Sequence, residues 1–285
     1  MLFENERQIA SAHALYDAAL GKWCTYGELR DLVARLAAAL DYPRKALAFC
    51  FTRNDLASVA WYLAAVEAGH AVALLDEGLT AEFKAGLIST YSPDFILTSV
   101  ATTDYTEIGG EQDRYAAATT PEPRNFFWRR KSMPEGTLHP DLTVLLSTSG
   151  STGSPKFVRL SRKNVVSNAE GISEVLEIRA SDRAISSLPF HYSYGLSVLN
   201  THLLVGASEV MTNEGLTSPA FWNVFREMEC CSFAGVPYSY QILKRLDVDK
   251  LNVPSLRVMT QAGGKLHKDL IAHFHQVMAA RHGRF

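Results

Sequence analysis

Residues 147–156 read STSGSTGSPK, and eight of these ten residues are Ser, Thr or Gly. Glycine lets the backbone approach a ligand closely, and successive main-chain N–H groups and hydroxyls can surround phosphate oxygens. Lys156 adds a mobile positive charge suited to a polyphosphate. Apolar runs at residues 143–146 and 157–160 flank the stretch. A flexible linker could share this composition, but it would explain neither the Pro-Lys ending nor the flanks, so the stretch predicts a phosphate loop.

Two better-known motifs do not match this loop. A Walker A loop requires Lys directly after Gly and a hydroxyl residue next, whereas Lys156 follows Pro155 and precedes Phe157. The G-x-S-x-G turn that presents a nucleophilic serine is also absent from the stretch. We therefore interpret its serines as phosphate donors rather than nucleophiles.

The rest of the chain alternates short apolar runs with helical periodicity. Thr25 and Glu28 form a T-x-x-E capping box, Thr52 or Asn54 would cap a second helix, and Thr80 a third. Such alternation predicts an α/β fold with mostly parallel sheets covered by helices. Further helices are expected over residues 161–176, 194–204, 219–229, 238–246 and 266–280. Strands are expected over residues 46–51, 71–75, 94–98, 143–146, 157–160, 184–188, 209–211, 232–236 and 256–261.

Residues 101–140 interrupt this rhythm, because they are rich in Thr, Glu, Pro and Arg and contain few apolar runs. Such a stretch is typical of a long connection with little structure of its own. We therefore expect two stacked α/β subdomains, 1–105 and 141–285, joined by an irregular connection over 106–140. The second subdomain would carry the phosphate loop.

Composition and charge exclude several classes of protein. The chain has 285 residues, of which 47% are hydrophobic and 20% charged, so it can bury a large core and is not disordered. The net charge is -2 and no dense Lys/Arg cluster occurs, which argues against nucleic-acid binding. No apolar stretch approaches the ~18 residues that span a membrane, and the charged N-terminus is unlike a signal peptide. We expect a cytoplasmic protein.

Cysteine and histidine spacing gives no metal site. The four cysteines contain no C-x-x-C pair, and they fit a reducing compartment as unpaired thiols. His273 and His275, with His267 nearby, would point to different faces of a helix, so we interpret them as surface residues.

The loop resembles the signature of the adenylate-forming superfamily, which includes acyl-CoA synthetases, amino-acid adenylation domains and luciferases. Its usual form is [YF]-T-S-G-[ST]-T-G-x-P-K, which residues 148–156 match throughout, while Ser147 departs from the aromatic position. The resemblance extends over nearly the whole chain. Similar family segments are TYGEL at 25–29, EAGHAVALLD at 67–76 with Leu74 in place of Pro, LPFHYSYGL at 188–196, GVP at 235–237 and AGGKL at 262–266.

The resemblance implies roles for residues in three of these segments. The phosphate loop would hold the β- and γ-phosphates of ATP, the glycine segment would border the adenine, and the remaining positions would form an acyl pocket. The phosphate-binding residues would be Thr148, Ser149, Gly150, Ser151, Thr152, Gly153 and Lys156. The adenine-binding residues would be Gly263, Gly264 and Lys265, and the acyl pocket would contain His191, Tyr194, Gly235 and Val236.

The implied reaction uses ATP and, in the full-length enzyme, Mg²⁺ to activate a small carboxylic acid. The acid and ATP give an acyl-adenylate and pyrophosphate, and a thiol of coenzyme A or of a phosphopantetheine carrier then takes the acyl group. Two alternatives stay open: an amino-acid or D-alanine adenylation domain that feeds a carrier protein, and a non-catalytic nucleotide-binding protein. Amino-acid adenylation domains usually carry Asp in an F-D-x-S segment, where this sequence has His191, which favours a plain acid.

The family continues beyond the glycine segment to a Y-G-x-T-E motif, a ribose-binding Asp, a hinge and a small C-terminal domain with a catalytic Lys. The sequence ends at Phe285, before these features. We therefore expect an N-terminal portion of an adenylating enzyme that is inactive alone, and we assign no catalytic residue and no metal ligand.

Overall fold

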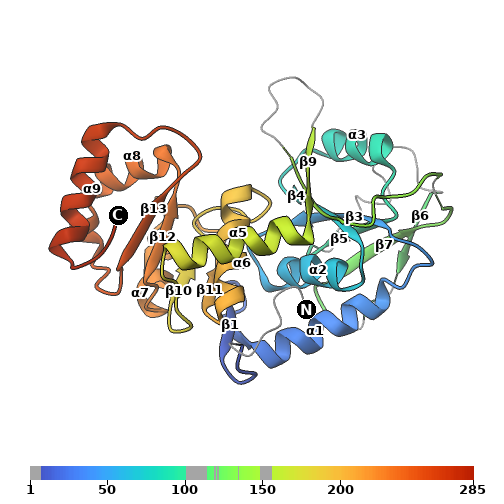
Figure 1. Ribbon diagram of the computed structural model, residues 1–285, viewed down its shortest axis with the longest axis horizontal. Coiled ribbons are helices and arrows are strands. Elements are labelled where there is room, and N and C mark those ends of the chain that lie inside the picture. The colour runs from blue at the N-terminus through green and yellow to red at the C-terminus, as the bar shows by residue number, and fades with distance from the viewer. Residues whose placement is uncertain (1–7, 101–113, 119, 121, 134, 148–155) are drawn as a thin grey trace. The chain divides into compact units, whose positions relative to one another are not determined.

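The computed structural model describes residues 8–100, 114–118, 120, 122–133, 135–147 and 156–285 (Figure 1). These residues form two compact units, each built around its own sheet. Unit 1 comprises Gly27–Asn168, and unit 2 combines the segment up to Tyr26 with Ala169–Phe285. The mixed α/β architecture with mostly parallel sheets is confirmed. In the described part of the chain, no helix is both long and apolar enough to cross a membrane.

Unit 1 contains a seven-stranded sheet whose central strands are parallel. Antiparallel strands extend it at both edges. Its strand order is β6 (Tyr115–Ala118), β7 (Phe126–Arg130), β5 (Phe95–Thr98), β3 (Leu47–Thr52), β4 (Ala71–Asp76), β8 (Leu142–Ser147) and β9 (Phe157–Ser161). Its helices are α1 (Tyr26–Ala39), α2 (Leu56–Glu67) and α3 (Ala81–Tyr91), and α5 (Arg162–Val175) begins in this unit.

The predicted helix caps of unit 1 are partly confirmed. Thr80 caps α3, since its hydroxyl accepts a hydrogen bond from Phe83 N at 3.3 Å. The cap of α2 is neither Thr52 nor Asn54 but Asp55, whose carboxylate accepts from Ser58 N at 2.8 Å. Asn54 is buried instead, so the better-placed carboxylate satisfies the first turn.

The expected irregular connection contains two strands. Residues Phe127 and Trp128 of β7 are buried, and β7 pairs antiparallel with β5. Composition concealed this strand, because the surrounding Thr, Pro and Arg residues dilute a short apolar run. The expected boundary at 106–140 is also corrected: β8, which we expected in the second subdomain, pairs with β4 in unit 1.

Unit 2 contains a six-stranded sheet that is parallel except for β2. The hairpin of β1 and β2 was not predicted. The strand order is β13 (Val258–Gln261), β12 (Ser232–Gly235), β10 (Arg183–Ile185), β11 (Ser208–Met211), β1 (His13–Asp17) and β2 (Lys22–Thr25). The helices are the rest of α5, α6 (Ser193–Val205), α7 (Pro219–Glu227), α8 (Pro237–Leu246), the 3-10 turn Val248–Leu251 and α9 (Lys268–Ala280).

The two faces of this sheet differ in what covers them. Successive strand residues point to opposite faces, and Phe233 of β12 and Met259 of β13 are paired in register. Both belong to an apolar core that also contains Phe225 of α7, Tyr240 of α8 and Phe274 of α9. Figure 1 shows α8 and α9 beside β12 and β13. The opposite face carries Ser232, Ala234, Val258 and Thr260, which line a cavity.

Candidate functional site

The loops that follow the parallel strands of unit 2 lie at the edge where ligands bind in open α/β sheets. The chain passes from β10 to β11 on one side, whereas β12 and β13 follow on the other side of β10. The connections therefore diverge between β10 and β12, and such a switch point is the usual binding crevice. The segments that emerge here are 186–192 after β10, Val236 after β12 and 262–266 after β13.

Gly195 fixes the first of these segments against α6. A Cβ atom at Gly195 would lie 2.7 Å from the Pro189 carbonyl carbon and 3.0 Å from the Leu188 oxygen. Main-chain atoms cannot retreat from such a contact as a flexible side chain can. The glycine of the LPFHYSYGL segment is therefore required for the close approach of α6 to the preceding loop.

The predicted adenine-binding glycines pack against the other two loops. Gly263 has a φ of +78°, and a Cβ there would lie 2.5 Å from Tyr192 Oη and 3.1 Å from Val236 Cγ1. A Cβ at Gly264 would lie 3.2 Å from Pro237 Cγ. The loops after β10, β12 and β13 therefore meet at one point of the edge.

Gly263, Gly264 and Lys265 are all exposed, so their main chain is accessible. Gln261 Nε2 donates a hydrogen bond to Gly264 O at 2.8 Å and holds the turn. Because the two glycines carry no side chains of their own, a planar ring could approach their exposed main chain closely. Their role with adenine stays a prediction.

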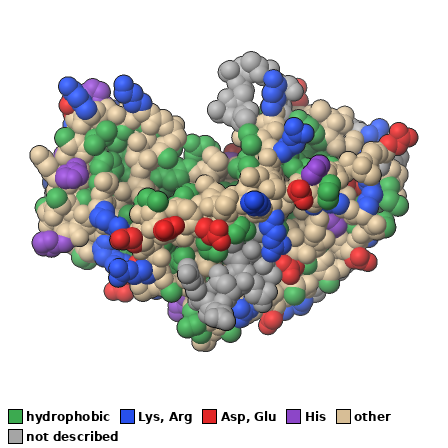
Figure 2. Space-filling view, in the orientation of Figure 1, with side chains coloured by type: hydrophobic (Ala, Val, Ile, Leu, Met, Phe, Trp, Pro, Cys, Tyr) green, Lys and Arg blue, Asp and Glu red, His purple; other side chains and the backbone are tan. Residues whose placement is uncertain are grey.

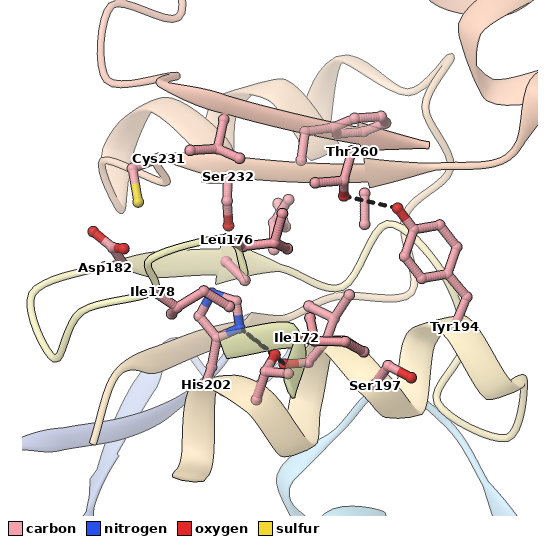
Figure 3. A pocket seen from close by; sticks show the side chains of 17 residues that line it. Ile172, Leu176, Ile178, Asp182, Tyr194, Ser197, His202, Cys231, Ser232 and Thr260 are labelled. Carbon is pink, nitrogen blue, oxygen red and sulfur yellow. Dashed lines mark hydrogen bonds between the residues drawn. The ribbon is translucent and has the colours of Figure 1, made fainter. Parts of the chain in front are cut away.

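A cavity extends along the sheet from this edge, enclosed by α5, α6 and the strands β10, β12 and β13 (Figure 3). Its interior volume is about 60 Å³, within a wider recess that is open to solvent. Its walls are largely apolar, with Ile172 from α5, Leu176 from the turn after it, Val198 from α6 and Ala184 from β10. Such a cavity with a few polar groups is typical of a small-molecule site.

Tyr194 stands at the end of the cavity near the carboxyl ends of the strands. Its hydroxyl hydrogen-bonds Thr260 Oγ1 at 2.7 Å, as Figure 3 shows. Burial raises the pKa of Tyr194, and hydrogen bonds from Thr260 and the Gly235 main chain act in the opposite direction. The phenol is therefore a neutral, fixed polar group at this end.

Of the four residues predicted for an acyl pocket, Tyr194 alone lines this cavity. His191 and Val236 are partly exposed in the loops at the strand edge. Gly235 faces the other side of the sheet: a Cβ there would lie 2.9 Å from Tyr240 Cε2 and 3.0 Å from Ser239 Cβ. The prediction that Gly235 contributes to an acyl pocket is therefore corrected, since its missing side chain makes room for α8.

Sequence reasoning missed most of the cavity wall. Tyr194, Ser197, Thr201 and His202 of α6 all line it, as does Val198. Their spacing of three and four residues places them on one face of the helix. This periodicity can be read from the sequence, but the LPFHYSYGL segment covers only the first turn of α6.

The phosphate loop lies in unit 1, and Thr148, Ser149, Gly150, Ser151, Thr152 and Gly153 fall outside the described residues. Its flanks are described: β8 ends at Ser147, and β9 begins at Phe157, directly after the exposed Lys156. The two strands pair antiparallel with Ser147 opposite Phe157. The predicted arrangement of strand, loop and strand is thus confirmed at its flanks.

The described ionisable groups, and the face drawn in Figure 2, show no second site. Basic and acidic side chains intermingle on the face drawn in Figure 2. Among the described residues, no group of three or more His, Cys, Asp or Glu could hold a metal ion. All four cysteines are buried thiols.

Comparison with known proteins agrees with this architecture. The chain is similar to ATP-bound MatB from Rhodopseudomonas palustris with a TM-score of 0.74 and 21% identity, over 98% of this chain and 56% of MatB. It is 30% identical to apicidin F synthase from Gibberella fujikuroi, over 85% of this chain and 5% of the relative. It is 24% identical to oxalate–CoA ligase from Arabidopsis thaliana, over 90% of this chain and 54% of the relative.

The chain thus spans about half of the length of the ligase, at 54%, and a small part of the synthase. The family model described as "AMP-binding enzyme" matches residues 2–283 of the chain. The resemblance drawn from the phosphate loop is confirmed, and the chain belongs to the AMP-binding enzyme family, whose members include adenylate-forming enzymes.

Proposed function

We propose that this protein activates a carboxylic acid with ATP and passes the acyl group to a thiol. The observation that carries the proposal is the apolar cavity that begins at the carboxyl edge of the unit 2 sheet, in a chain of the AMP-binding family. ATP-bound MatB shares the fold, which supports ATP as the nucleotide.

In the first step, a carboxylate oxygen attacks the α-phosphorus of ATP, the bond between the α- and β-phosphates breaks, and pyrophosphate leaves. A carboxylic acid is already ionised at pH 7, so this step requires no general base. The protein instead aligns the two reactants and offsets phosphate charge. Hydroxyls and amides of residues 148–153, with the Lys156 ammonium, would hold the β- and γ-phosphates, while Gly263, Gly264 and Lys265 would border the adenine.

Mg²⁺ belongs to the proposal as the partner of ATP. The described residues contain no cluster of acidic or histidine ligands that would hold the ion by themselves. We therefore assign it no ligand in this chain and route no step through it.

In the second step, the sulfur of a thiol attacks the acyl carbonyl carbon, AMP leaves, and the thiol proton is released. Coenzyme A and a phosphopantetheine arm present the same thiol chemistry. The relatives include a CoA ligase and a large synthase, so both acceptors are supported.

A plain acid fits the cavity better than an amino acid. The segment 186–197 contains no Asp or Glu that could pair with an α-ammonium group. Asp182 is the one acidic residue in the described cavity lining, and Arg257 Nη2 lies 2.6 Å from its Oδ1. Its Oδ2 accepts a hydrogen bond from Arg179 N at 3.0 Å, so both carboxylate oxygens are engaged.

The proposal is tested by binding and by exchange. Plain acids, but not amino acids, should bind the chain in titration calorimetry. Acid-dependent exchange of pyrophosphate into ATP is expected of the full-length enzyme rather than of this chain alone, and it should follow the same preference. Binding of amino acids alone would favour the adenylation-domain alternative, and binding of neither would count against acid activation.

The role of Lys156 has a matched control. Lys156→Ala should weaken ATP binding by about ten- to hundredfold, since a charged contact to phosphate contributes roughly 1.5–3 kcal/mol. Acid binding should be unaffected. Lys163→Ala, which removes an exposed lysine from α5, should change neither. Equal ATP affinity in both variants would show that Lys156 does not contact phosphate.

A further inference from the structure

His202 lies at the end of the cavity opposite Tyr194 (Figure 3). The two residues are eight positions apart on α6, which corresponds to about 12 Å along the helix. His202 is 4% exposed, and Figure 3 shows its side chain rising from α6 toward the strands of the facing wall. The strand residues at this end, Ser232 and Val258, begin β12 and β13, so the cavity runs the length of the strands.

The hydrogen bonds of His202 determine which ring nitrogen carries the proton. Nδ1 lies 2.8 Å from Val198 O and 3.3 Å from Thr201 Oγ1. A carbonyl oxygen can only accept, so Nδ1 must be the protonated nitrogen. Nε2 is then an acceptor, and it is buried with no hydrogen-bond partner among the described residues.

Three other polar side chains at this end, those of Asp182, Cys231 and Thr201, already have partners. Asp182 is paired with Arg257, and Cys231 Sγ accepts a hydrogen bond from Arg183 N at 3.1 Å. Thr201 Oγ1 donates to Val198 O at 2.9 Å. Burial lowers the pKa of His202, while the Val198 carbonyl and Asp182 act in the opposite direction, so the ring is neutral at pH 7.

A buried acceptor without a donor destabilises the site unless a ligand supplies the missing hydrogen bond. We propose that His202 selects acids that carry a hydroxyl at the end distal from the carboxylate, with that hydroxyl donating to Nε2. This inference rests on the proposed function, in which the acid occupies the cavity. The carboxylate would lie near the loops at the strand edge, the chain would follow the apolar walls, and the hydroxyl would reach His202.

Two alternatives for the distal group fit less well. A terminal methyl would leave Nε2 both desolvated and unpaired, which is how a polar site rejects an apolar analogue. A terminal ammonium would bring a charge into an apolar cavity where His202 is neutral and Asp182 is already paired.

The test uses straight-chain acids in pairs of equal length that end in either a methyl or a hydroxyl group, chosen to span about 12 Å. Their binding to the chain is measured by titration calorimetry. The hydroxy acid should bind roughly five- to tenfold more tightly. His202→Leu should remove this preference, and His202→Gln, which retains an acceptor oxygen, should keep part of it. His275→Leu, at an exposed histidine on α9, should leave it unchanged.

The outcomes separate this inference from the proposed function. If both acids bind equally to the unaltered chain, or the methyl acid binds better, water alone satisfies Nε2 and the inference is wrong, while acid binding still stands. If no acid binds, the proposed function fails and the inference fails with it. If circular dichroism shows that His202→Leu does not fold, the affinity ratio of hydroxy acid to methyl acid is compared between His202→Gln and the unaltered chain. A ratio of one in the unaltered chain, or an undiminished ratio in His202→Gln, overturns the selection of hydroxy acids by His202.

Discussion

The two units build similar parallel sheets but fill the space above them differently. In unit 1, α2 covers β3 and β4 with large side chains, and Trp61, Tyr62 and Leu63 are completely buried. In unit 2, the sheet face under α5 and α6 carries small side chains, among them Ala184 and Ala234. A close-packed interior tolerates few voids, so the size of the strand side chains decides where a cavity can exist. Unit 1 is therefore closely packed between α2 and its sheet, whereas unit 2 leaves room for a cavity between α5, α6 and its sheet.

The sharpest test of this contrast deletes the same atoms in both units. Leu63→Ala on α2 should lower the free energy of unfolding by about 2–5 kcal/mol, because it opens a new void in a filled interior. Leu176→Ala, in the turn directly after α5, should lower the free energy of unfolding by about 1 kcal/mol, because this side chain already borders a cavity and is half-buried. Urea unfolding curves give both values, and equal losses would contradict the contrast between the units.

The close approach of α6 to its preceding loop should give the next largest effect. Gly195→Ala introduces a Cβ that overlaps the Pro189 carbonyl group, and we expect a loss of about 3 kcal/mol. Gly171→Ala on α5 is the matched control, since a Cβ there meets nothing within 4 Å. It should stabilise the chain by about 0.5–1 kcal/mol. In thermal denaturation, the melting temperature of Gly195→Ala should fall and that of Gly171→Ala should rise.

The two faces of β12 can be compared at adjacent residues. Gly235→Ala should lower stability by about 1–2 kcal/mol, because its Cβ would press on Tyr240 and Ser239. Acid binding per folded molecule should be retained. Ala234→Leu fills the cavity instead, and it should weaken binding of long acids by about tenfold while costing less stability. If Gly235→Ala weakened the binding of long acids alone, Gly235 would belong to the cavity wall after all.

The smallest expected effect is a pH dependence in unit 2. Glu209 of β11 is buried, and burial raises its pKa from 4.5 to about 8. The folded state therefore holds a proton that the unfolded state loses above its ordinary pKa. The contribution of Glu209 to stability is therefore fully present below about pH 4.5 and is lost as pH rises toward 8. One group changes the free energy of unfolding by at most about 1.4 kcal/mol per pH unit, so we expect about 1 kcal/mol between pH 6 and 7.

Glu209→Gln is the variant that checks this assignment. Its amide cannot titrate, so the decline between pH 6 and 7 should disappear in urea unfolding curves. A slope that persists in the variant would assign the pH dependence to other groups.

Local signals predicted most helices and strands of both units. The cap at Thr80 and the apolar runs that became β3 and β4 depend on neighbours a few residues away. The strand β7 escaped detection, because its short apolar run is surrounded by Thr, Pro and Arg. The cap of α2 was placed one or three residues too early, because Thr52, Asn54 and Asp55 are all plausible caps until burial distinguishes them.

The sequence alone was sufficient for the family, the α/β class and the two strands that flank the predicted phosphate loop, because the loop motif and its apolar flanks are contiguous in the chain. Tertiary structure decided the division into units, since β8 joins β4 from about 70 residues away in sequence, by a pairing that no local pattern encodes. It also decided the cavity, because the side of the sheet that Ala234 and Gly235 face follows from strand register and from the helices packed on each side. His202 became a candidate only when folding buried its Nε2 without a donor, which is a property of its surroundings rather than of the residue.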